Sequence, residues 1–547
     1  MQFPAARFLR TIPAIWIAVL LLPSLFWIFA DHRVWPWDPG YYGYWTLRLF
    51  RLMNEGQFHP WYNATIHALG IMPPLLVWVA QFFLPLRHVT GSVESALLLS
   101  NICAAAGTLA LVYKVTRDLE PDGDVLRPLA AVSVCGSASL FIGLTHHYFT
   151  EPLQTLTSAL AMVLAFGAQH RSGLRNFAFA VILTSLGFLA KASSVVFVLP
   201  ALTYMAAALL AAWGDERPRV TRADVLWFGA AVASTFAVVR WYTTNKHAVM
   251  THFVQATVGT EIKNYWEPAP FLTELRYWIA ALAEALAVTP VISALLALGC
   301  CAALVIAARK LRDQKGLLIL REAVNNGTLF GYYLAGTIAA TIFIYALQIN
   351  RDPRFLAPLV PVAAVLVGWA LVVLRRPIFA VSVLTMATAT GVTANMVTFG
   401  LVPTLNYSGW LWPVDGTFDE QNALTRVVSA TCRDEVHPSV IGVSYPWTNG
   451  NSANFYAEKQ RLKTGVGCNY VAFSQADVAS ALALLDSVQA GYVVTIAPER
   501  QDPVNFANTI SKPIAEALAS DSRFELMPDS DVRFKLYKRV ENTETPR

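Results

Sequence analysis

The sequence predicts an α-helical polytopic membrane protein with about eleven transmembrane helices and a C-terminal soluble α/β domain. Of its 547 residues, 55% are hydrophobic and only 14% are charged, whereas soluble proteins carry about a quarter charged residues. Apolar runs long enough to span a bilayer recur from residue 12 to about residue 400. Beyond them, charge and short apolar runs alternate, so we expect a transmembrane domain at 1–403 and a soluble domain at 404–547.

The basic residues predict the orientation of the spans. They cluster in short loops, such as the one with Arg375 and Arg376, and loops of this kind face the cytoplasm. Because they are not pooled on one segment, the net charge of +5 does not indicate nucleic-acid binding. We expect a bacterial inner-membrane protein with a cytoplasmic N-terminus and a periplasmic C-terminal domain. The basic loops share one side if the spans lie near 12–30, 93–115, 128–147, 152–169, 176–191, 194–213, 224–241, 286–308, 328–347, 355–374 and 378–400.

Two outer loops are long enough to suggest a function. The first runs from Asp31 to about Ser92 and includes an expected helix at 44–53. The apolar stretch at 71–86 begins with two prolines and is short for a span, so we expect an interfacial or re-entrant helix there. The second loop runs from Thr243 to about Ala283. The first apolar segment lacks a small-residue cleavage site, which predicts a retained anchor.

The C-terminal domain reads as α/β. Buried strands are expected at 440–445 and 492–496, a helix at 476–490, and a hairpin from 524–527 and 532–537. Cys432 and Cys468 are its only cysteines, and a periplasmic location favours a disulfide between them over two free buried thiols. The domain has no glycine-rich phosphate loop, metal-ligand cluster or nucleophile elbow. We therefore expect a recognition or stabilising domain and not a second catalytic centre.

Several charged and aromatic groups fall at the outer ends of the predicted spans. Asp38 follows the first span among aromatic rings, and a carboxylate at a membrane face usually has a function. Two acids and three cations on one face suit a reaction on an anionic, lipid-linked substrate. The candidate groups are Asp38, Tyr41, Tyr42, His146, His147, Glu151, Lys191, Arg351 and Arg354.

Five motifs, in order along residues 1–400, resemble those of one family. They are Asp38 with Tyr41 or Tyr42, Pro73-Pro74-Leu75, Glu151-Pro152-Leu153, Leu189-Ala190-Lys191 before Pro200, and Arg354-Phe355-Leu356-Ala357-Pro358-Leu359-Val360-Pro361. Together they resemble the GT-C membrane glycosyltransferases, in the branch of the protein O-mannosyltransferases and the lipid A aminoarabinose transferases. Two positions depart from the family pattern, because Pro39 stands where many relatives have Glu and Glu151 where many have Asp.

The resemblance implies an inverting glycosyltransferase with a GT-C-like transmembrane domain. It would move a sugar from a polyprenyl-phosphate donor to a cell-envelope acceptor, either lipid, glycan or protein, on the periplasmic face. Asp38 would be the base and Glu151 would orient the acceptor or the base. Lys191, Arg351 and Arg354 would hold the lipid phosphate. The remaining tyrosines and histidines of the candidate set would contact substrate, and no cofactor or metal is indicated.

Simpler roles for the same residues remain open. Asp38 would cap a helix that begins near Gly40, and Glu151 would favour a helix N-terminus. Lys191 would only reach the interface, and Arg354 would anchor a span. The adjacent histidines would ligate a structural metal. A transporter or flippase of a lipid-linked glycan, or a non-catalytic assembly protein, are the alternative functions.

Overall fold

The computed structural model describes residues 5–212, 219–257, 267–311, 317–403, 410–432, 437–473, 477–497, 499–502, 505–530 and 533–540. By its internal contacts the chain forms two compact units. The helical unit comprises Met1–Phe29, Gly70–Leu76 and Leu98–Val414. The sheet unit comprises Ala30–Leu69, Val77–Leu97 and Asp415–Arg547. The predicted domains were continuous at 1–403 and 404–547, whereas here most of the first outer loop groups with the C-terminal segment.

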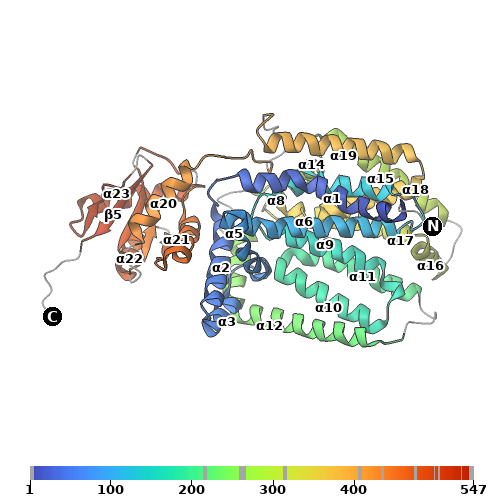
Figure 1. The fold of residues 1–547 in the computed structure, drawn as a ribbon, viewed down its shortest axis with the longest axis horizontal. Coiled ribbons are helices and arrows are strands. Elements are labelled where there is room, and N and C mark those ends of the chain that lie inside the picture. The colour runs from blue at the N-terminus through green and yellow to red at the C-terminus, as the bar shows by residue number, and fades with distance from the viewer. Residues whose placement is uncertain are drawn as a thin grey trace. The chain divides into compact units, whose positions relative to one another are not determined.

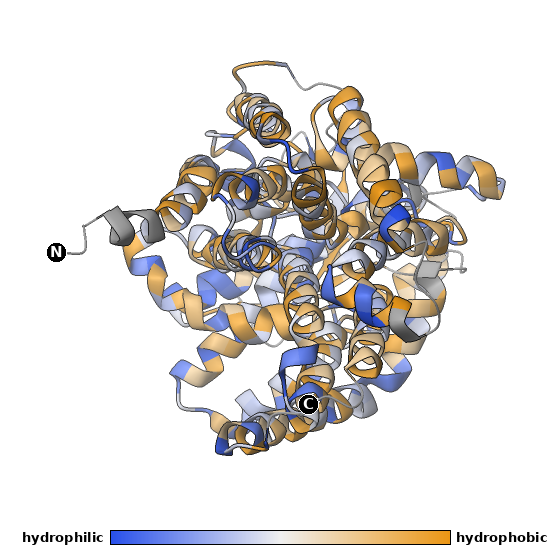
Figure 2. Ribbon diagram, turned by 90° about the vertical axis from the view of Figure 1, so that its right-hand side faces the viewer, coloured by the Kyte–Doolittle hydropathy of each residue, from blue (hydrophilic) through white to orange (hydrophobic). Residues whose placement is uncertain are grey.

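The helical unit is a bundle of long apolar helices, which are mostly orange in Figure 2. One helix, α18, is buried over most of its length, whereas α12 lies at the outside and is largely exposed. The helices are α1 (Ala5–Ala30), α6 (Val93–Asp118), α7 (Leu126–Gly136), α8 (Ser139–Thr145), α9 (Glu151–Phe166), α10 (Gly173–Ala190), α11 (Val195–Ala211), α12 (Arg222–Thr257), α14 (Phe271–Leu286), α15 (Pro290–Leu311), α16 (Leu317–Asn325), α17 (Thr328–Tyr345), α18 (Leu359–Leu374) and α19 (Pro377–Thr398).

The polytopic fold class is confirmed, but the number of spans is lower than expected. Within the described ranges, nine helices are long and apolar enough to cross a membrane, or ten if α7 and α8, bent by 63°, form one span. The remaining predicted span corresponds to α9, which has only 16 residues. The second outer loop is also shorter than predicted, because α12 continues to Thr257 and α14 begins at Phe271. Residues 258–266 of that loop lie outside the described part.

The sheet unit contains one mixed five-stranded sheet in the order β2-β1-β3-β5-β4. The edge strand β2 and its neighbours β1 and β3 are parallel, and β5 pairs antiparallel with both β3 and β4. Val440, Val493 and Tyr537 from three of these strands form a core with Ile514 and Leu518. The strands are β1 (Ser439–Ile441), β2 (Tyr470–Ala472), β3 (Tyr492–Ile496), β4 (Phe524–Leu526) and β5 (Phe534–Arg539).

The expected elements of the C-terminal segment appear with shifted bounds. The first strand ends at Ile441 instead of residue 445, and the helix spans Val478–Ser487. Position 532 of the hairpin lies outside the described residues. The structure joins Cys432 and Cys468 by a disulfide, with their Cα atoms 4.9 Å apart. The helices of this segment are α20 (Asp419–Thr431), α21 (Gly450–Thr464), α22 (Val478–Ser487) and α23 (Asn505–Ser520).

Short helices form the N-terminal part of the sheet unit. The expected helix at 44–53 begins earlier, at Trp37, and the apolar stretch after Ile71 breaks into short helical pieces, as its two prolines suggest. These elements are α2 (Trp37–Asn54), α3 (Phe58–His67), α4 (Leu75–Ala80), the 3-10 helix η1 (Gln81–Leu86) and α5 (Arg87–Thr90).

Helix α2 packs closely along α21, two helices far apart in the sequence (Figure 1). Two glycines one helical turn apart allow this approach. A Cβ atom on Gly40 would lie 3.0 Å from the Ser452 nitrogen, and one on Gly43 would lie 2.7 Å from the Phe455 ring. The Trp35 indole also stacks on Phe455, with ring centroids 5.1 Å apart. The aromatic stretch around Asp38 is therefore fixed by packing against the C-terminal segment.

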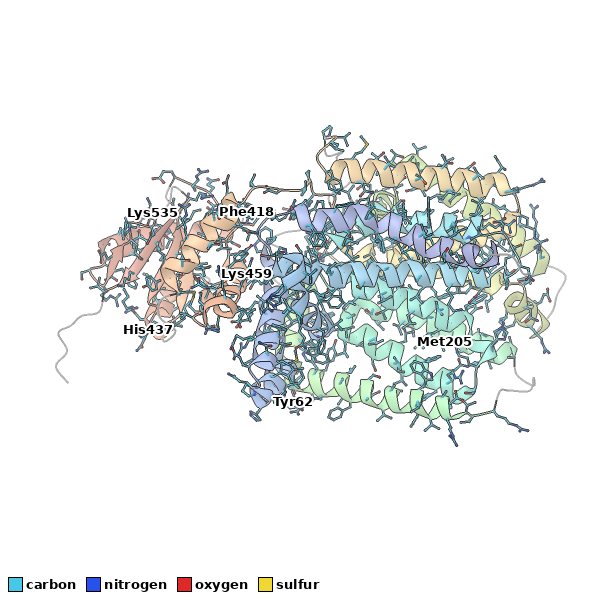
Figure 3. The ribbon with its side chains drawn as sticks, in the orientation of Figure 1. Tyr62, Met205, Phe418, His437, Lys459 and Lys535 are labelled. Atoms are coloured by element: carbon cyan, nitrogen blue, oxygen red, sulfur yellow. A yellow bond between two sulfur atoms is a disulfide. The ribbon has the colours of Figure 1, made fainter. Side chains whose placement is uncertain are left out.

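Buried ion pairs reinforce this contact within the sheet unit. Arg51 of α2 donates to Glu458 of α21 at 2.5 Å, and the Glu458 side chain is only 2% exposed. Lys459, labelled in Figure 3, pairs with Glu94 at 2.6 Å. Because breaking one member of such a pair leaves a buried charge uncompensated, the Arg51–Glu458 pair also fixes the register of α2 on α21. The Lys459–Glu94 pair instead joins α21 to the beginning of α6.

A leucine at Gly43 should destabilise the sheet unit by about 1–3 kcal/mol, because overpacking forces α2 away from α21. Pulse proteolysis in urea would measure the loss. Gly416→Leu is the matched control, since a Cβ atom there meets nothing within 4 Å. Equal stability of the two variants would contradict the close packing described here.

Candidate functional site

A buried carboxylate lies at the beginning of α9. Glu151 is the first residue of this helix and is 1% exposed, and Pro152 follows it in the first turn. Proline is favoured in the first turn because its fixed φ suits the start of a helix. A carboxylate in the first turn is stabilised by the unpaired amide groups of that turn. Helix α9 packs against α10, α11 and α18 (Figure 1), and two of these helices have neighbouring loops that supply cations.

Two cations surround Glu151 within the helical unit. Lys191 lies just after α10, where the backbone becomes extended, and its Nζ is 2.6 Å from Glu151 Oε1. Arg354 lies in the short 3-10 helix η4 (Pro353–Leu356) before α18, with its Nε 3.5 Å from the same oxygen. The structure therefore brings together three of the residues that the sequence predicted, from three separate segments of the chain.

A fourth charged group, Asp352, was missed by the sequence analysis. Its Oδ2 lies 2.6 Å from Arg354 Nε, and its Oδ1 accepts from the Arg354 backbone amide at 3.1 Å. Burial raises the pKa of Asp352 above its ordinary value, and the nearby Arg354 opposes this rise. Its place between Arg351 and Arg354 in the loop was the available signal. Asp352 thus caps η4, and its carboxylate and that of Glu151 both contact the Arg354 Nε.

Aromatic rings cover the two cations. Lys191 Nζ lies 4.1 Å from the centre of the Phe355 ring, and Arg354 Cζ lies 4.7 Å from that of Phe149. Such cation–π contacts hold a cation without using its hydrogen-bond donors. Both side chains keep about a fifth of their surface exposed, 21% for Lys191 and 19% for Arg354. The cluster therefore presents two preoriented, partly exposed cations that can contact an anionic ligand.

Arg351, the third predicted cation, belongs to a separate ion pair. Its guanidinium contacts both carboxylate oxygens of Glu274, at distances from 2.5 to 3.0 Å, and Glu274 is 3% exposed. Tyr277, three residues along α14, donates to the Arg351 carbonyl at 2.5 Å. Glu274 was not predicted as a functional residue because this segment was expected to be part of a loop. The i,i+3 spacing of Glu274 and Tyr277, which places both side chains on one face of a helix, was the available signal.

The two predicted histidines are buried in aromatic surroundings. His146 is 3% exposed and stacks on Trp27 with ring centroids 4.2 Å apart, and its Nε2 lies 3.1 Å from the Ser24 hydroxyl. His147 meets the Trp412 ring edge-on at 4.3 Å. In the described part of the chain, no three His, Cys, Asp or Glu side chains are placed to hold one metal ion.

Asp38, Tyr41 and Tyr42 lie in the sheet unit. Asp38 is the second residue of α2, one turn before Tyr41, and is half-buried. Pro36 occupies the N-cap position, two residues before Asp38. Tyr41 donates to the Leu69 carbonyl at 2.6 Å, and burial, with a smaller effect from the charge of Asp38, raises its pKa to about 12. Tyr42 is 5% exposed and packs in the core.

The chain resembles known glycosyltransferases in sequence and in fold. Residues 72–242 match the family profile of dolichyl-phosphate-mannose-protein mannosyltransferases. No curated protein sequence matches the chain.

Two solved structures share the fold of this chain, and a third is more distantly similar. The apo structure of ArnT from Cupriavidus metallidurans covers 98% of this chain and 99% of its own, with 13% identity and a TM-score of 0.57. ArnT bound to undecaprenyl phosphate has the same coverage, with 14% identity and a TM-score of 0.54. An oligosaccharyltransferase from Archaeoglobus fulgidus is more distant, with 13% identity, coverage of 96% and 73%, and a TM-score of 0.45. The resemblance to GT-C membrane glycosyltransferases, and the fold that it implies, are confirmed.

Glu151→Gln should destabilise the helical unit by about 1–3 kcal/mol, because it removes the charge that accepts from Lys191 and pairs with Arg354. Adding Lys191→Met should recover part of this loss, since the lysine then leaves no unpaired charge. A double-mutant cycle on the free energy of unfolding measures the coupling.

Asp118→Asn is the control for this cycle, because it breaks the exposed Lys114–Asp118 pair of the same unit. That change should cost at most about 1 kcal/mol. Strictly additive effects of Glu151→Gln and Lys191→Met would show that the buried carboxylate does not hold the lysine.

Proposed function

We propose that this chain, which has the GT-C fold, is an inverting glycosyltransferase that moves a sugar from a polyprenyl-phosphate carrier to a cell-envelope acceptor. The family match over residues 72–242 supports the reaction class. The likeness to ArnT, one structure of which holds undecaprenyl phosphate, supports the donor class. The clustering of basic residues in loops on one predicted side supports a periplasmic active face in a bacterial inner membrane.

One observation carries the proposal, the pairing of Lys191 and Arg354 with the buried Glu151. When the sugar leaves its carrier, the departing group is a phosphate anion that needs cationic stabilisation more than a proton. Cations held in advance supply this stabilisation without reorganisation during the reaction. Glu151 contacts both cations, Asp352 contacts Arg354, and both cations are about one-fifth exposed. Their exposed surfaces would contact the phosphate oxygens, with Arg354 suited to a bidentate contact.

Arg351 is the weakest of the three proposed phosphate ligands. Both oxygens of the buried Glu274 already bind its guanidinium, and a phosphate would have to compete with this pair. The pair links α14 to the loop that carries Arg354, and we assign Arg351 to positioning that loop.

Asp38 is the proposed general base. A carboxylate can accept a proton from an acceptor hydroxyl that lies within hydrogen-bond reach. Direct attack of that hydroxyl on the anomeric carbon, with the phosphate leaving from the opposite face, inverts the configuration. The hydroxyl proton passes to Asp38, and the bond from the anomeric carbon to the phosphate oxygen breaks.

Asp38→Asn should lower the rate of sugar transfer by about 100-fold or more, because loss of a general base typically costs that much. The assay follows release of polyprenyl phosphate from a panel of polyprenyl-phosphate sugars in membranes that contain native envelope acceptors. Glu55→Gln, at the other end of α2, is the control and should transfer at the wild-type rate. Full activity of Asp38→Asn would make Glu151 the next candidate for the base.

Lys191→Met and Arg354→Met should each raise the donor KM by about tenfold or more, because a charged contact to phosphate is lost. Arg351→Met should instead lower stability and leave the donor KM unchanged. Steady-state kinetics with purified protein, read beside thermal unfolding midpoints, separates the two effects. A donor KM that responds to Arg351→Met and not to Lys191→Met would reverse these assignments.

A further inference from the structure

The sheet unit contains a cavity of about 150 Å³ that opens to the surface. Its floor is formed by residues that follow β1 and end β2, and its side by the first turn of α21 and by Trp37 of α2. In the strand order β2-β1-β3, the chain runs from β1 first to β2, on one side of β1, and later to β3, on its other side. Ligands of open α/β sheets bind at this switch point, outside the carboxyl ends of the parallel strands.

The chemistry of the lining selects a neutral ligand. No lining residue has a charged side chain, and Ile441, Val443 and Phe473 supply apolar surface. A helix N-terminus ordinarily attracts anions, but here the Asn449 side chain already accepts from the amides of Asn451 and Ser452, at 3.0 Å each. The polar groups that remain include the Ser444 hydroxyl. A ligand with one apolar face and several hydroxyl groups, such as a sugar ring, meets both requirements.

Trp37 forms an aromatic wall of this cavity. Its side chain is held by a hydrogen bond of 3.3 Å from Nε1 to the Ser444 Oγ, yet the residue remains 38% exposed. Its backbone φ is +25°, which is unusual for a bulky residue. Strained conformations of this kind persist where the surrounding structure imposes them, and they concentrate at functional sites. The strain supports a role for the exposed indole face in binding.

We infer that this cavity is the acceptor subsite and binds a neutral sugar ring of the acceptor against Trp37. The inference rests on the proposed function, and it narrows the acceptor to a glycan or glycolipid. Asp38 follows Trp37 directly in the first turn of α2, so the proposed base and the proposed sugar-binding ring are adjacent residues of the chain. The cavity contributes binding and specificity, while Asp38 contributes the chemistry.

Saturation-transfer NMR on the full chain in lipid nanodiscs tests binding directly, with glucose, galactose, mannose, rhamnose and N-acetylglucosamine as probes. Nanodiscs avoid glycoside detergents, which would compete for the cavity. At least one sugar should bind to the wild type and to Asp38→Asn. Ala472→Phe, which fills the cavity, should abolish the signal, whereas Ala479→Phe on the exposed face of α22 should keep it. Asn451→Ala, which only removes a side-chain amide, should weaken it and serves if Ala472→Phe does not fold.

Transfer kinetics separates this inference from the proposed function. Ala472→Phe should raise the acceptor KM by about tenfold, equivalent to about 1.4 kcal/mol, and leave the donor KM unchanged. Normal transfer with an unchanged acceptor KM, or no sugar signal in the wild type, would overturn the subsite while the transferase remains. Sugar binding that depends on Ala472 in a protein without transfer activity would overturn the proposed function and leave a sugar-binding site.

Discussion

The buried carboxylate of Glu151 holds together the charged cluster of the helical unit, because it contacts both Lys191 and Arg354. An ionised group with 1% exposure is stable only when cations and hydrogen-bond donors replace its water. Lys191 and Arg354 fulfil this need from the end of α10 and the beginning of α18. One carboxylate therefore fixes three helix ends, and the same contacts orient the cations proposed to bind phosphate. The stability of this cluster and its proposed role in phosphate binding therefore depend on the same interactions.

In the sheet unit, apolar packing positions the candidate residues. Its candidate residues lie on α2, a short helix that would be marginal by itself in water. Gly40 and Gly43 bring the helix backbone against α21, and the stack of Trp35 on Phe455 closes the contact. Ion pairs such as that of Arg51 with Glu458 then fix the register. Asp38 is thus placed by shape complementarity, whereas Lys191 and Arg354 are placed by charge.

The sequence predicted the elements whose signals are local. Long apolar runs predicted most of the spans, and the short, mainly apolar run at 492–496 predicted the buried strand β3. It could not predict β2, whose three residues are too few for a periodic signal. The grouping of Lys191 and Arg354 around Glu151 was expected from their motifs, but the partners Asp352 and Glu274 were missed. Ion pairs between distant segments depend on tertiary packing, and a single sequence carries no direct record of them. The disulfide between Cys432 and Cys468 was predicted from two cysteines in one segment together with the expected periplasmic location, and the structure joins the two residues.

The division of the sheet unit between two distant segments has a consequence for biosynthesis. The ribosome makes α2 early, but α21 and the strands beside it follow only after the last helix of the helical unit has been made. Domains fold as units once all their parts are available. The segment that carries Asp38 must therefore wait for its packing partners until the later segment of the sheet unit has been made. Ordering of the proposed base thereby becomes a late event, coupled to completion of the whole polypeptide.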